Sequence, residues 1–427
     1  MLAMQFQLEQ SQWWTPAEML RHQFVQLTQV LAHASTTVPY YRERLPAAGY
    51  QPQGELSLDV FRRVPLLTRT DIQAAGPALL SLAVPAGHGR SVRGSTSGST
   101  GTPIQHWSTD LAAFFVQAFT MRDHLWHGRD LQGKLLAIRF VPAPVTHGGW
   151  FVSEQGESFF ETGPSIGVPI HTSVSAQIDQ ILAHQPDYLQ GHASNLRELA
   201  LQWRERGLPR PNLREVRSFA EVLAPDTREL VREVLAPLVT DVYSAQECGC
   251  LALQCPQHEH YHVQSESAYV EILRDDGEPC VPGEIGRVVI TTLHNFAMPL
   301  IRYDIGDYAE VGSPCDCGRG LPVLTRILGR VRNMMALPSG DKRWPFIGSG
   351  YRQLAPVRQF QVIQKTIRQV ELRLVVERTL TLEEEAKVRA YALERLGHAF
   401  DLTVAYCEEI PRSAGGKFED FKSEVAV

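Results

Sequence analysis

Strand-like and helix-like segments alternate through the middle of this chain, and this alternation limits its fold more than any other feature. Four short apolar segments, Lys134–Val141, Pro186–Leu189, Val216–Ala220 and Asp241–Tyr243, have the character of buried strands, with helix-forming sequence between them. Strands that alternate with helices build parallel sheets, because each crossover helix returns the chain to the same edge. The pattern therefore predicts a parallel α/β region.

The segments on either side have a different character. Leu20, Phe24, Leu27 and Leu31 recur at helical spacing within the first 45 residues, and a short β-like segment follows at Val64–Leu67. From Tyr269 onward, short strands separated by Gly and Asp turns predict an antiparallel region. After Gly329 come two strand-like runs, a helix at about Leu382–Leu396 and one more strand, which predict a small α+β unit.

The predicted fold class is therefore α/β, with two domains. Residues 1–328 form a large N-terminal domain, a layered α/β structure with an antiparallel β subregion. Residues 329–427 form a small α+β C-terminal domain, with the boundary near Gly329. A chain of 427 residues is too long for one compact core, which agrees with this division.

Composition excludes several function classes. The formal net charge of −6 argues against a broad nucleic-acid or membrane-surface footprint. No stretch approaches the roughly 20 apolar residues that a membrane span needs. The first residues lack the pattern of a signal peptide, so a cytoplasmic location is expected.

A run of glycine, serine and threonine occupies positions 94–102, within R-G-S-T-S-G-S-T-G-T-P-I-Q. Such a run is most often a flexible linker. This one is short and lies between a strand-like segment and a helix that starts near Thr109. Glycine-rich backbone N–H groups and hydroxyls can converge on an anion, which favours a phosphate-binding loop. It is neither a Walker loop nor the G-x-S-x-G of a serine hydrolase.

Four further motifs supply polar partners. They are Y-S-A-Q-E (Tyr243–Glu247), P-L-I-R-Y-D-I-G-D (Pro299–Asp307), I-L-G-R-V-R-N (Ile327–Asn333) and P-R-S-A-G-G-K (Pro411–Lys417). Each alone could be a turn, a hinge or a solvated tail. Together and in this order, the chain resembles the adenylate-forming (ANL) superfamily, and more closely the phenylacetate–coenzyme A ligase family. The resemblance covers essentially the whole chain, including V-P-Y-Y-R-E-R-L-P-A-A-G-Y near the start.

The resemblance implies a role for each motif. The glycine-rich loop binds the β- and γ-phosphates of ATP through Ser97, Gly98, Ser99, Thr100 and Gly101. Tyr243 stacks on adenine, and Glu247 helps to hold Mg²⁺, for which a carboxylate oxygen is a suitable ligand. Asp307 binds the ribose hydroxyls, and Arg330 contacts the same region. Lys417 matches the catalytic lysine that bridges the substrate carboxylate and the α-phosphate.

The function that follows is ATP-dependent activation of a carboxylic acid, aromatic or otherwise apolar by the resemblance, to an acyl-adenylate. Two negative groups must meet in this reaction, so positioning and charge neutralisation by lysine and Mg²⁺ matter most. The resemblance then implies rotation of the small domain and transfer to coenzyme A as a thioester. Adenylation followed by transfer to an acyl carrier protein or an amine is the alternative.

Several residues depart from the family pattern. Gln105 lies near the place where the loop commonly carries a lysine, and Gln246 replaces the threonine before Glu247. Asn333 stands where the hinge aspartate usually lies. Phe219–Ala220 replaces the glycine pair before Glu221. These changes leave the glutamate, the ribose-binding aspartate and the final lysine in place. They leave open which molecule accepts the acyl group.

The pocket for the acid should use the segment from Phe140 to Phe151 and residues near Gly191 and Glu221. Trp150 and Phe151 could form its walls or could simply be packing residues. No charged residue in that segment indicates a polar substrate.

A cysteine–histidine cluster predicts a structural zinc site. Five of the seven cysteines lie in C-G-C-L-A-L-Q-C-P-Q-H-E-H-Y-H (248–262) and C-D-C-G (315–318). Cys255, His262, Cys315 and Cys317 would make a tetrahedral Cys₃His site, and many members of the resembled family carry a similar pattern. His258 or Cys250 could replace one ligand, and unligated cysteines beside surface histidines are the alternative.

His258–His262 also matches H-E-x-x-H, which marks a zinc hydrolase only when it lies on a helix. Pro256 and the following strand-like segment argue against a helix, so this remains a remote alternative. A non-enzymatic binding module is a third possibility.

Overall fold

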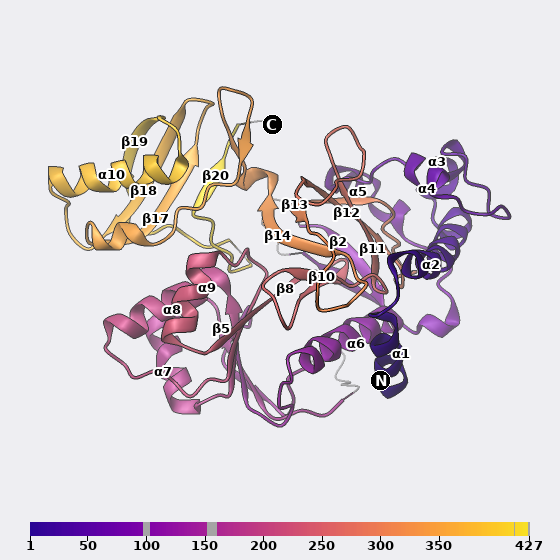
Figure 1. Cartoon of the computed structure of the whole chain (residues 1–427), viewed down its shortest axis with the longest axis horizontal. Coiled ribbons are helices and arrows are strands. Elements are labelled where there is room, and N and C mark those ends of the chain that lie inside the picture. Colours follow the sequence, from indigo (N-terminus) through magenta and orange to yellow (C-terminus); the bar gives the residue numbers. More distant parts are fainter. Residues whose placement is uncertain (97–102, 152–159, 414, 426–427) are drawn as a thin grey trace.

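The computed structural model describes residues 1–96, 103–151, 160–413 and 415–425, which form a large N-terminal part and a small C-terminal part (Figure 1). The helices are α1 (Leu2–Ser11), α2 (Pro16–Thr37), α3 (Tyr41–Ala47), α4 (Leu58–Arg63), α5 (Arg69–Ala75), α6 (Asp110–Trp126), α7 (Val174–His184), α8 (Ala193–Glu205), α9 (Pro225–Val234) and α10 (Leu382–Leu396).

The first ten strands are β1 (Ser91–Ser95), β2 (Gln105–Thr109), β3 (Leu135–Arg139), β4 (Val145–His147), β5 (Ser165–Pro169), β6 (Tyr188–His192), β7 (Glu215–Phe219), β8 (Leu238–Ala245), β9 (Gly249–Gln254) and β10 (Tyr261–Val263). The others are β11 (Ala268–Leu273), β12 (Ile285–Thr292), β13 (Tyr303–Val311), β14 (Val323–Arg330), β15 (Met335–Ala336), β16 (Lys342–Arg343), β17 (Val357–Gln364), β18 (Gln369–Val376), β19 (Asp401–Tyr406) and β20 (Phe421–Ser423).

Local sequence explains where the longer helices begin and end. Thr15 and Glu18 form a capping box at the start of α2, and Pro16 occupies a position whose N–H needs no partner. α2 ends at Thr37, two residues before Pro39. A second capping box, Thr381 with Glu384, starts α10, and Gly397 ends it in the left-handed conformation (φ +64°).

One twelve-stranded sheet runs through the N-terminal part, in the order β11-β12-β13-β14-β10-β9-β8-β7-β6-β3-β5-β4. Strands β8, β7, β6, β3 and β5 are parallel, and the strands from β9 to β14 pair antiparallel. The sequence separates these two regions correctly. Only the structure shows that the parallel and antiparallel regions form one sheet. Strand β8 pairs with β7 on one side and with β9 on the other, which joins the two regions.

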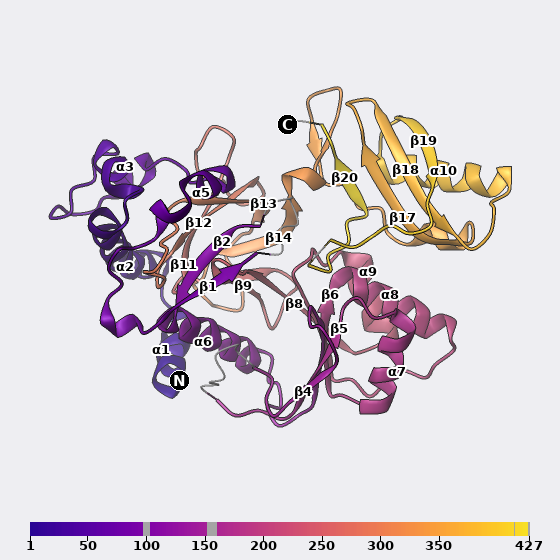
Figure 2. The ribbon, with the colours of Figure 1, turned by 180° about the vertical axis from the view of Figure 1, so that it is seen from behind.

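Separate cores lie on the two regions of this sheet. The antiparallel region packs against α2, α3 and their neighbours through Leu27, Leu31, Phe61 and Ile290. The parallel region packs against α7, α8 and α9, with Trp203 fully buried between them. Figure 2 shows the two groups of helices at opposite ends of the N-terminal part.

The C-terminal part has a sheet and a core of its own. Its four strands run in the order β19-β18-β17-β20, and α10 covers them through Val388, Ala392 and Leu396. This is the small α+β unit that the sequence predicts, and it follows β14 in the chain. A functional boundary near Gly329 stays a prediction.

The β-like segment at Val64–Leu67 is not a strand. It contributes one isolated bridge between Leu67 and Tyr303. Pro65 has no N–H to donate, which prevents a longer ladder there. Within the described residues, no helix is both long and apolar enough to cross a membrane.

Candidate functional site

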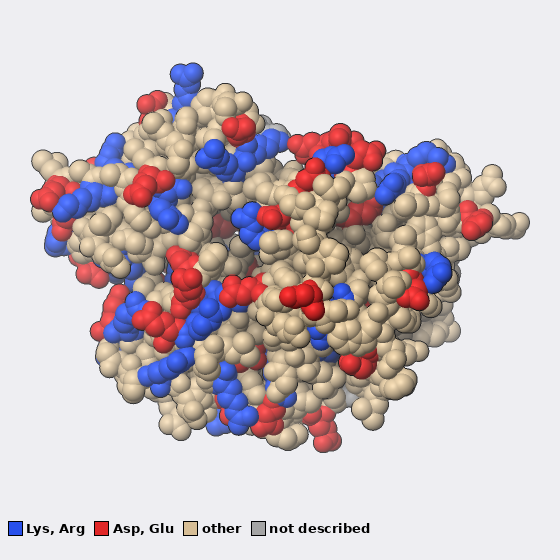
Figure 3. Space-filling model, in the orientation of Figure 1, with Lys and Arg blue, Asp and Glu red and all other residues tan. Residues whose placement is uncertain are grey.

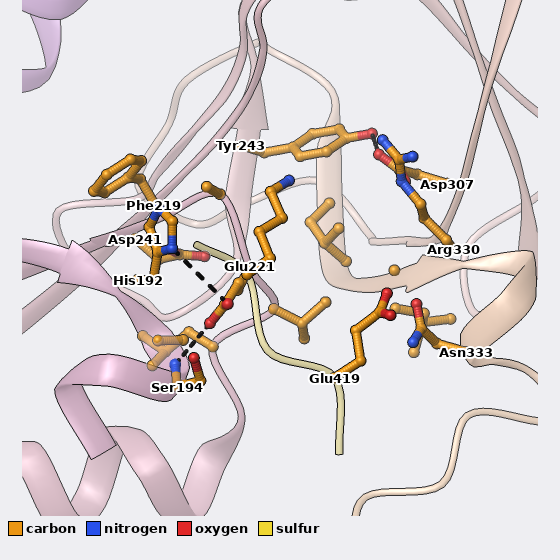
Figure 4. Close-up of a pocket in the computed structure, with 18 of the residues that line it drawn as sticks. His192, Ser194, Phe219, Glu221, Asp241, Tyr243, Asp307, Arg330, Asn333 and Glu419 are labelled. Atoms are coloured by element: carbon orange, nitrogen blue, oxygen red, sulfur yellow. Dashed lines mark hydrogen bonds and ion pairs between the residues drawn. The ribbon is translucent and has the colours of Figure 1, made fainter. Parts of the chain in front are cut away.

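A cavity of about 1220 Å³ lies where the two parts of the chain meet. Its lining comes from the carboxyl ends of β3, β6, β7 and β8, from β13 and β14, and from the loop around Lys417. Ligands of α/β proteins bind at the carboxyl ends of parallel strands. Figure 4 shows side chains from both parts pointing into this space.

One wall of the cavity carries Tyr243, Asp307 and Arg330. The Tyr243 hydroxyl donates to Asp307 Oδ2 at 2.8 Å, and Arg330 Nε lies 3.4 Å from Asp307 Oδ1 (Figure 4). Asp307 and Arg330 are direct neighbours in the β13–β14 register. Burial, followed by the nearby Asp307 carboxylate, raises the pKa of Tyr243 well above its usual range, so its hydroxyl stays a donor. The structure thus brings three predicted residues together.

Glu247 and Lys417 line the same cavity. Glu247 is buried and accepts a hydrogen bond from the Tyr303 hydroxyl at 3.3 Å. Burial lowers the pKa of Lys417, and the charge of Arg330 adds to this effect. A carboxylate and an ammonium group therefore face one space, as the sequence predicts.

The loop that carries Lys417 lies against the ends of β5 and β6. Gly416 has φ +78°, and a Cβ there would lie only 2.8 Å from Ile170 Cγ2. Glycine is therefore required both for the conformation and for the close approach. The side chain of Arg412 in the same loop donates to Ser194 Oγ at 2.8 Å and to the Gly416 carbonyl at 3.0 Å.

Glu221 connects the Lys417 loop to the N-terminal part. Its Oε2 accepts from the Ser194 N–H at 2.7 Å, in the first turn of α8, and its Oε1 accepts from the Phe418 N–H at 2.8 Å. His192 Nδ1 lies 3.9 Å from Oε1 (Figure 4). The sequence indicates Glu221 only as a residue near the acid pocket, and its contact with the distant loop is new.

Further contacts between the two parts of the chain are polar. Arg352 Nη2 lies 2.5 Å from Glu198 Oε2, and Arg197 Nη1 lies 3.7 Å from Asp420 Oδ2. Figure 3 shows acidic and basic side chains interspersed where the C-terminal part meets the surface below it. Interfaces of this polar kind permit relative motion of domains.

The predicted phosphate loop, Ser97, Gly98, Ser99, Thr100 and Gly101, lies outside the described residues. Thr96 and Pro103, on either side of this loop, both line the cavity. Strands β1 and β2, which lead to these positions, pair in register from Ser91–Thr109 to Ser95–Gln105.

The acid pocket differs in part from the prediction. Phe140, His192 and Phe219 line the cavity, but among the described lining residues neither Trp150 nor Phe151 occurs. Trp150 is buried elsewhere: its Nε1 donates to the Gly133 carbonyl at 2.8 Å, and its ring packs on Tyr188. Trp150 is therefore a packing residue.

Arg139 and Asp241 are cavity residues that belong to no sequence motif. Arg139 ends β3, and Asp241 lies within β8. Burial raises the pKa of Asp241 to about 6, although the Tyr261 hydroxyl donates to its Oδ2 at 2.6 Å. Their place at or near the carboxyl ends of predicted parallel strands is the signal that could have found them.

The four predicted zinc ligands come together. Cys255, His262, Cys315 and Cys317 place their ligand atoms within 4.8 Å of one another. Cys255 Sγ is 4.0 Å from Cys315 Sγ, and Cys317 Sγ is 3.4 Å from His262 Nε2. Tetrahedral zinc with Zn–S near 2.3 Å places its ligand atoms about 3.5–3.8 Å apart, so these residues fit the ion.

The surroundings of this cluster agree with the fit. His262 Nδ1 lies 3.5 Å from the Leu321 carbonyl, which leaves Nε2 directed at the sulfurs. Cys250 is packed in a hydrophobic core with Phe119 and Leu253 and belongs to neither ligand group in the described residues. His258 pairs with Asp316 Oδ1 at 2.6 Å, which forms a second, overlapping group with Cys315.

The H-E-x-x-H match lies on a turn that leads into β10. A hydrolase of that type needs both histidines on one face of a helix. That requirement is not met, so the zinc-hydrolase alternative loses its structural basis.

Comparisons with known proteins agree with this geometry. Residues 348–424 match the family model "CapK C-terminal domain". The chain is 27% identical to a phenylacetate–coenzyme A ligase of Thermus thermophilus, covering 94% of this chain and 96% of that protein. It is 25% identical to the Escherichia coli K12 protein of the same description, covering 90% of each. The resemblance that the sequence predicts is confirmed.

A solved structure shares the fold. 2-Hydroxyisobutyryl-CoA ligase in its postadenylation state superposes with a TM-score of 0.75 at 20% identity, covering 97% of this chain and 92% of that chain. The same ligase in its thioesterification state gives 0.63. The predicted fold class is confirmed.

Proposed function

We propose that this chain, a relative of phenylacetate–coenzyme A ligases with the ANL fold, is an AMP-forming acid–coenzyme A ligase. The observation that carries the proposal is the single cavity that collects Tyr243, Glu247, Asp307, Arg330 and Lys417 from both parts of the chain. Each has the chemistry that one portion of an acyl-adenylate requires: an aromatic ring, carboxylates and two cations.

In the first step, a substrate carboxylate oxygen attacks the α-phosphorus of ATP, and pyrophosphate leaves. The Lys417 ammonium neutralises the charge where the two anions meet. Asp307 accepts from the ribose hydroxyls while Arg330 fixes its carboxylate, and Tyr243 offers its ring to adenine. Mg²⁺, held by Glu247, would supply further neutralisation of the phosphates.

In the second step, the thiol of coenzyme A attacks the acyl carbonyl, and AMP leaves. We propose that residues 329–427 move as one unit between the steps. The C-terminal part has its own core, and its contacts with α8 are polar, which supports this motion. Coenzyme A is preferred over a carrier protein or an amine because the curated relatives are coenzyme A ligases.

The acid is proposed to be aromatic or otherwise apolar near its reacting end. Phe140, Phe219 and Val242 line the cavity beside the Lys417 loop, which supports an apolar wall. Zinc is proposed at the Cys255 cluster, where it would join the turn after β9, strand β10 and the β13–β14 loop. Four protein ligands leave no open position, so the role would be structural.

The test is ATP–pyrophosphate exchange over a panel of aryl, arylacetic and fatty acids, followed by AMP release with and without coenzyme A. We expect exchange with one acid class and AMP release that requires coenzyme A. Lys417→Ala should lower exchange by about 10²-fold or more, since it removes a charge from the reacting centre. Full exchange in that variant would contradict the assigned role, and no exchange with any acid would contradict adenylation.

A further inference from the structure

Arg139 is a cation of the cavity that has no ion-pair partner among the described residues. Other cavity arginines are paired: Arg330 with Asp307, Arg197 with Asp420 and Arg326 with Glu310. Within the described residues, the Arg139 side chain has no ion pair, and its buried Nε has no hydrogen-bond partner. A half-buried guanidinium that is left unpaired costs free energy, unless a ligand supplies the missing acceptor.

In the part of the chain that the structure describes, no acid compensates the charge of Arg139. Burial lowers the pKa of Arg139, and no described carboxylate opposes that effect. The opposite holds for buried Arg129, which lies between Asp123 and Glu215. Buried Arg129 is therefore paired with acids, whereas half-buried Arg139 lines the cavity without an ion pair in the described residues.

The backbone of Arg139 is linked to the Lys417 loop through Ile170. The Arg139 carbonyl accepts from the Ile170 N–H at 2.9 Å, and Ile170 is the residue against which Gly416 packs. The Arg139 side chain lies over Gly167 in β5, where a Cβ would be 3.7 Å from Arg139 Nε. Arg139 and Lys417 line the same cavity.

A molecule that bridges Lys417 and Arg139 would cross an apolar surface. Phe140, Phe219 and Val242 line the same cavity, and β3 is separated from β7 by one strand, β6. Neighbouring strands lie about 4.8 Å apart, so the part of the cavity between the ends of β3 and β7 is roughly 10 Å wide. A small organic acid fits within this width.

We propose that the acid substrate carries a second anionic group, a carboxylate or another oxyanion, and that Arg139 binds it while the first carboxylate reacts. This inference rests on the proposed adenylation activity and narrows its substrate class to acids with a distal negative charge. The planar guanidinium can donate two parallel hydrogen bonds to such a group. Arg139 directly precedes the segment from Phe140 to Phe151, in which no charged residue indicates a polar substrate.

The test compares matched acids in the exchange assay: adipate with hexanoate, and 4-carboxyphenylacetate with 4-methylphenylacetate. We expect kcat/KM for the doubly charged member of at least one pair to exceed that of its neutral partner by about 10²-fold, the effect of hydrogen bonds to a charged group. Arg139→Leu should remove this preference without lowering exchange for the neutral acid. Arg139→Lys should retain part of the preference.

Arg326→Leu is the matched control, since Arg326 lines the same cavity but is paired with Glu310. It should leave the preference between paired acids unchanged. Preference for the neutral acid in both pairs would overturn the inference. So would an equal loss for both members of a pair in Arg139→Leu, or a rise in KM for ATP alone, which would assign Arg139 to the nucleotide.

Calorimetric binding of adipate and 4-carboxyphenylacetate separates this inference from the proposed function. Binding to the wild type but not to Arg139→Leu, without exchange, would sustain the anion site and overturn adenylation. Exchange with neutral acids only would sustain adenylation and overturn the anion site. Failure of both dianions to bind or react would overturn the inference.

Discussion

Glu221 offers the sharpest test of how the two parts of the chain cooperate. Its two carboxylate oxygens accept from Ser194 N–H in α8 and from Phe418 N–H beside Lys417. The first contact also places a negative charge at the N-terminus of α8, where it is favourable. One side chain therefore joins the N-terminal part to the Lys417 loop in the observed arrangement. We expect Glu221→Gln to favour separation of the two parts.

The expected slowing of adenylation follows from the number of hydrogen bonds that the substitution removes. The Glu221 side chain is only 9% exposed, so solvent screens these bonds little. A glutamine can still accept one of the two N–H groups with its single oxygen, but it loses the other bond and the charge. A hydrogen bond to a charged group contributes about 1.5–3 kcal/mol, and about 1.4 kcal/mol is tenfold in an equilibrium. Adenylation should slow roughly tenfold or more.

The assay measures the two half-reactions separately. ATP–pyrophosphate exchange reports adenylation, and thioester formation from supplied acyl-adenylate reports the second step. Exchange should fall while the second step is unchanged or faster, because the contact keeps the Lys417 loop at the cavity, where Lys417 is proposed to act in adenylation. Glu233→Gln is the control, since Glu233 is 72% exposed and pairs with Arg204 within the N-terminal part. Equal slowing of both steps in Glu221→Gln would refute a role of Glu221 in positioning the Lys417 loop. Glu221 would then serve only as a cap for helix α8.

Three further predictions concern charge and metal. Burial lowers the pKa of Lys417 from its usual range near 10.4. We therefore expect kcat/KM for adenylation to fall as the pH rises toward that range, because the ammonium group loses its proton. A kcat/KM that stays constant through this pH range would contradict the role of the Lys417 charge. Burial raises the pKa of Asp241 to about 6, so its ionised form costs about 3 kcal/mol above that pH and nothing below pH 4. In urea titrations, Asp241→Asn should therefore raise the unfolding free energy at pH 8 more than at pH 5, and equal changes would disprove the burial argument. Elemental analysis should find about one zinc per chain in the wild type and in Cys407→Ser but little in Cys317→Ser; zinc retained in Cys317→Ser would exclude that ligand.

Local patterns predict most elements of this fold. The helix expected at about Leu382–Leu396 has those bounds, because a capping box and a following glycine mark its ends. The strand order could not be predicted: β10 pairs with β14, so Tyr261 lies beside Leu324, far away in the chain. Such long-range pairing depends on packing that no local pattern records.

The candidate site, like the fold, can be predicted from the sequence only in part. Tyr243, Glu247, Asp307, Arg330 and Lys417 are found by motif, and they line one cavity. Arg139 belongs to no motif and is of interest only because the sheet places it in the wall of the cavity that Lys417 also lines.

Trp150 illustrates an alternative that the sequence leaves open. An aromatic residue in the predicted acid segment can form a pocket wall or pack in the core, and in the structure the indole N–H donates to the Gly133 carbonyl and the ring packs inside the protein. Sequence cannot tell a wall from a core residue when both need the same apolar surface.

Asn333 shows that a departure from a family pattern can have a local cause. Its Nδ2 donates to the Phe421 carbonyl at 2.8 Å, and Phe421 is a buried core residue of the C-terminal part. An aspartate has no N–H and would direct a negative oxygen at that carbonyl. Because the contact joins the turn after β14 to β20, the amide ties Asn333 to the sheet of the unit proposed to move. The turning point would then lie before Asn333, near Gly329, which has φ +88° and lies at an irregularity in the β13–β14 register.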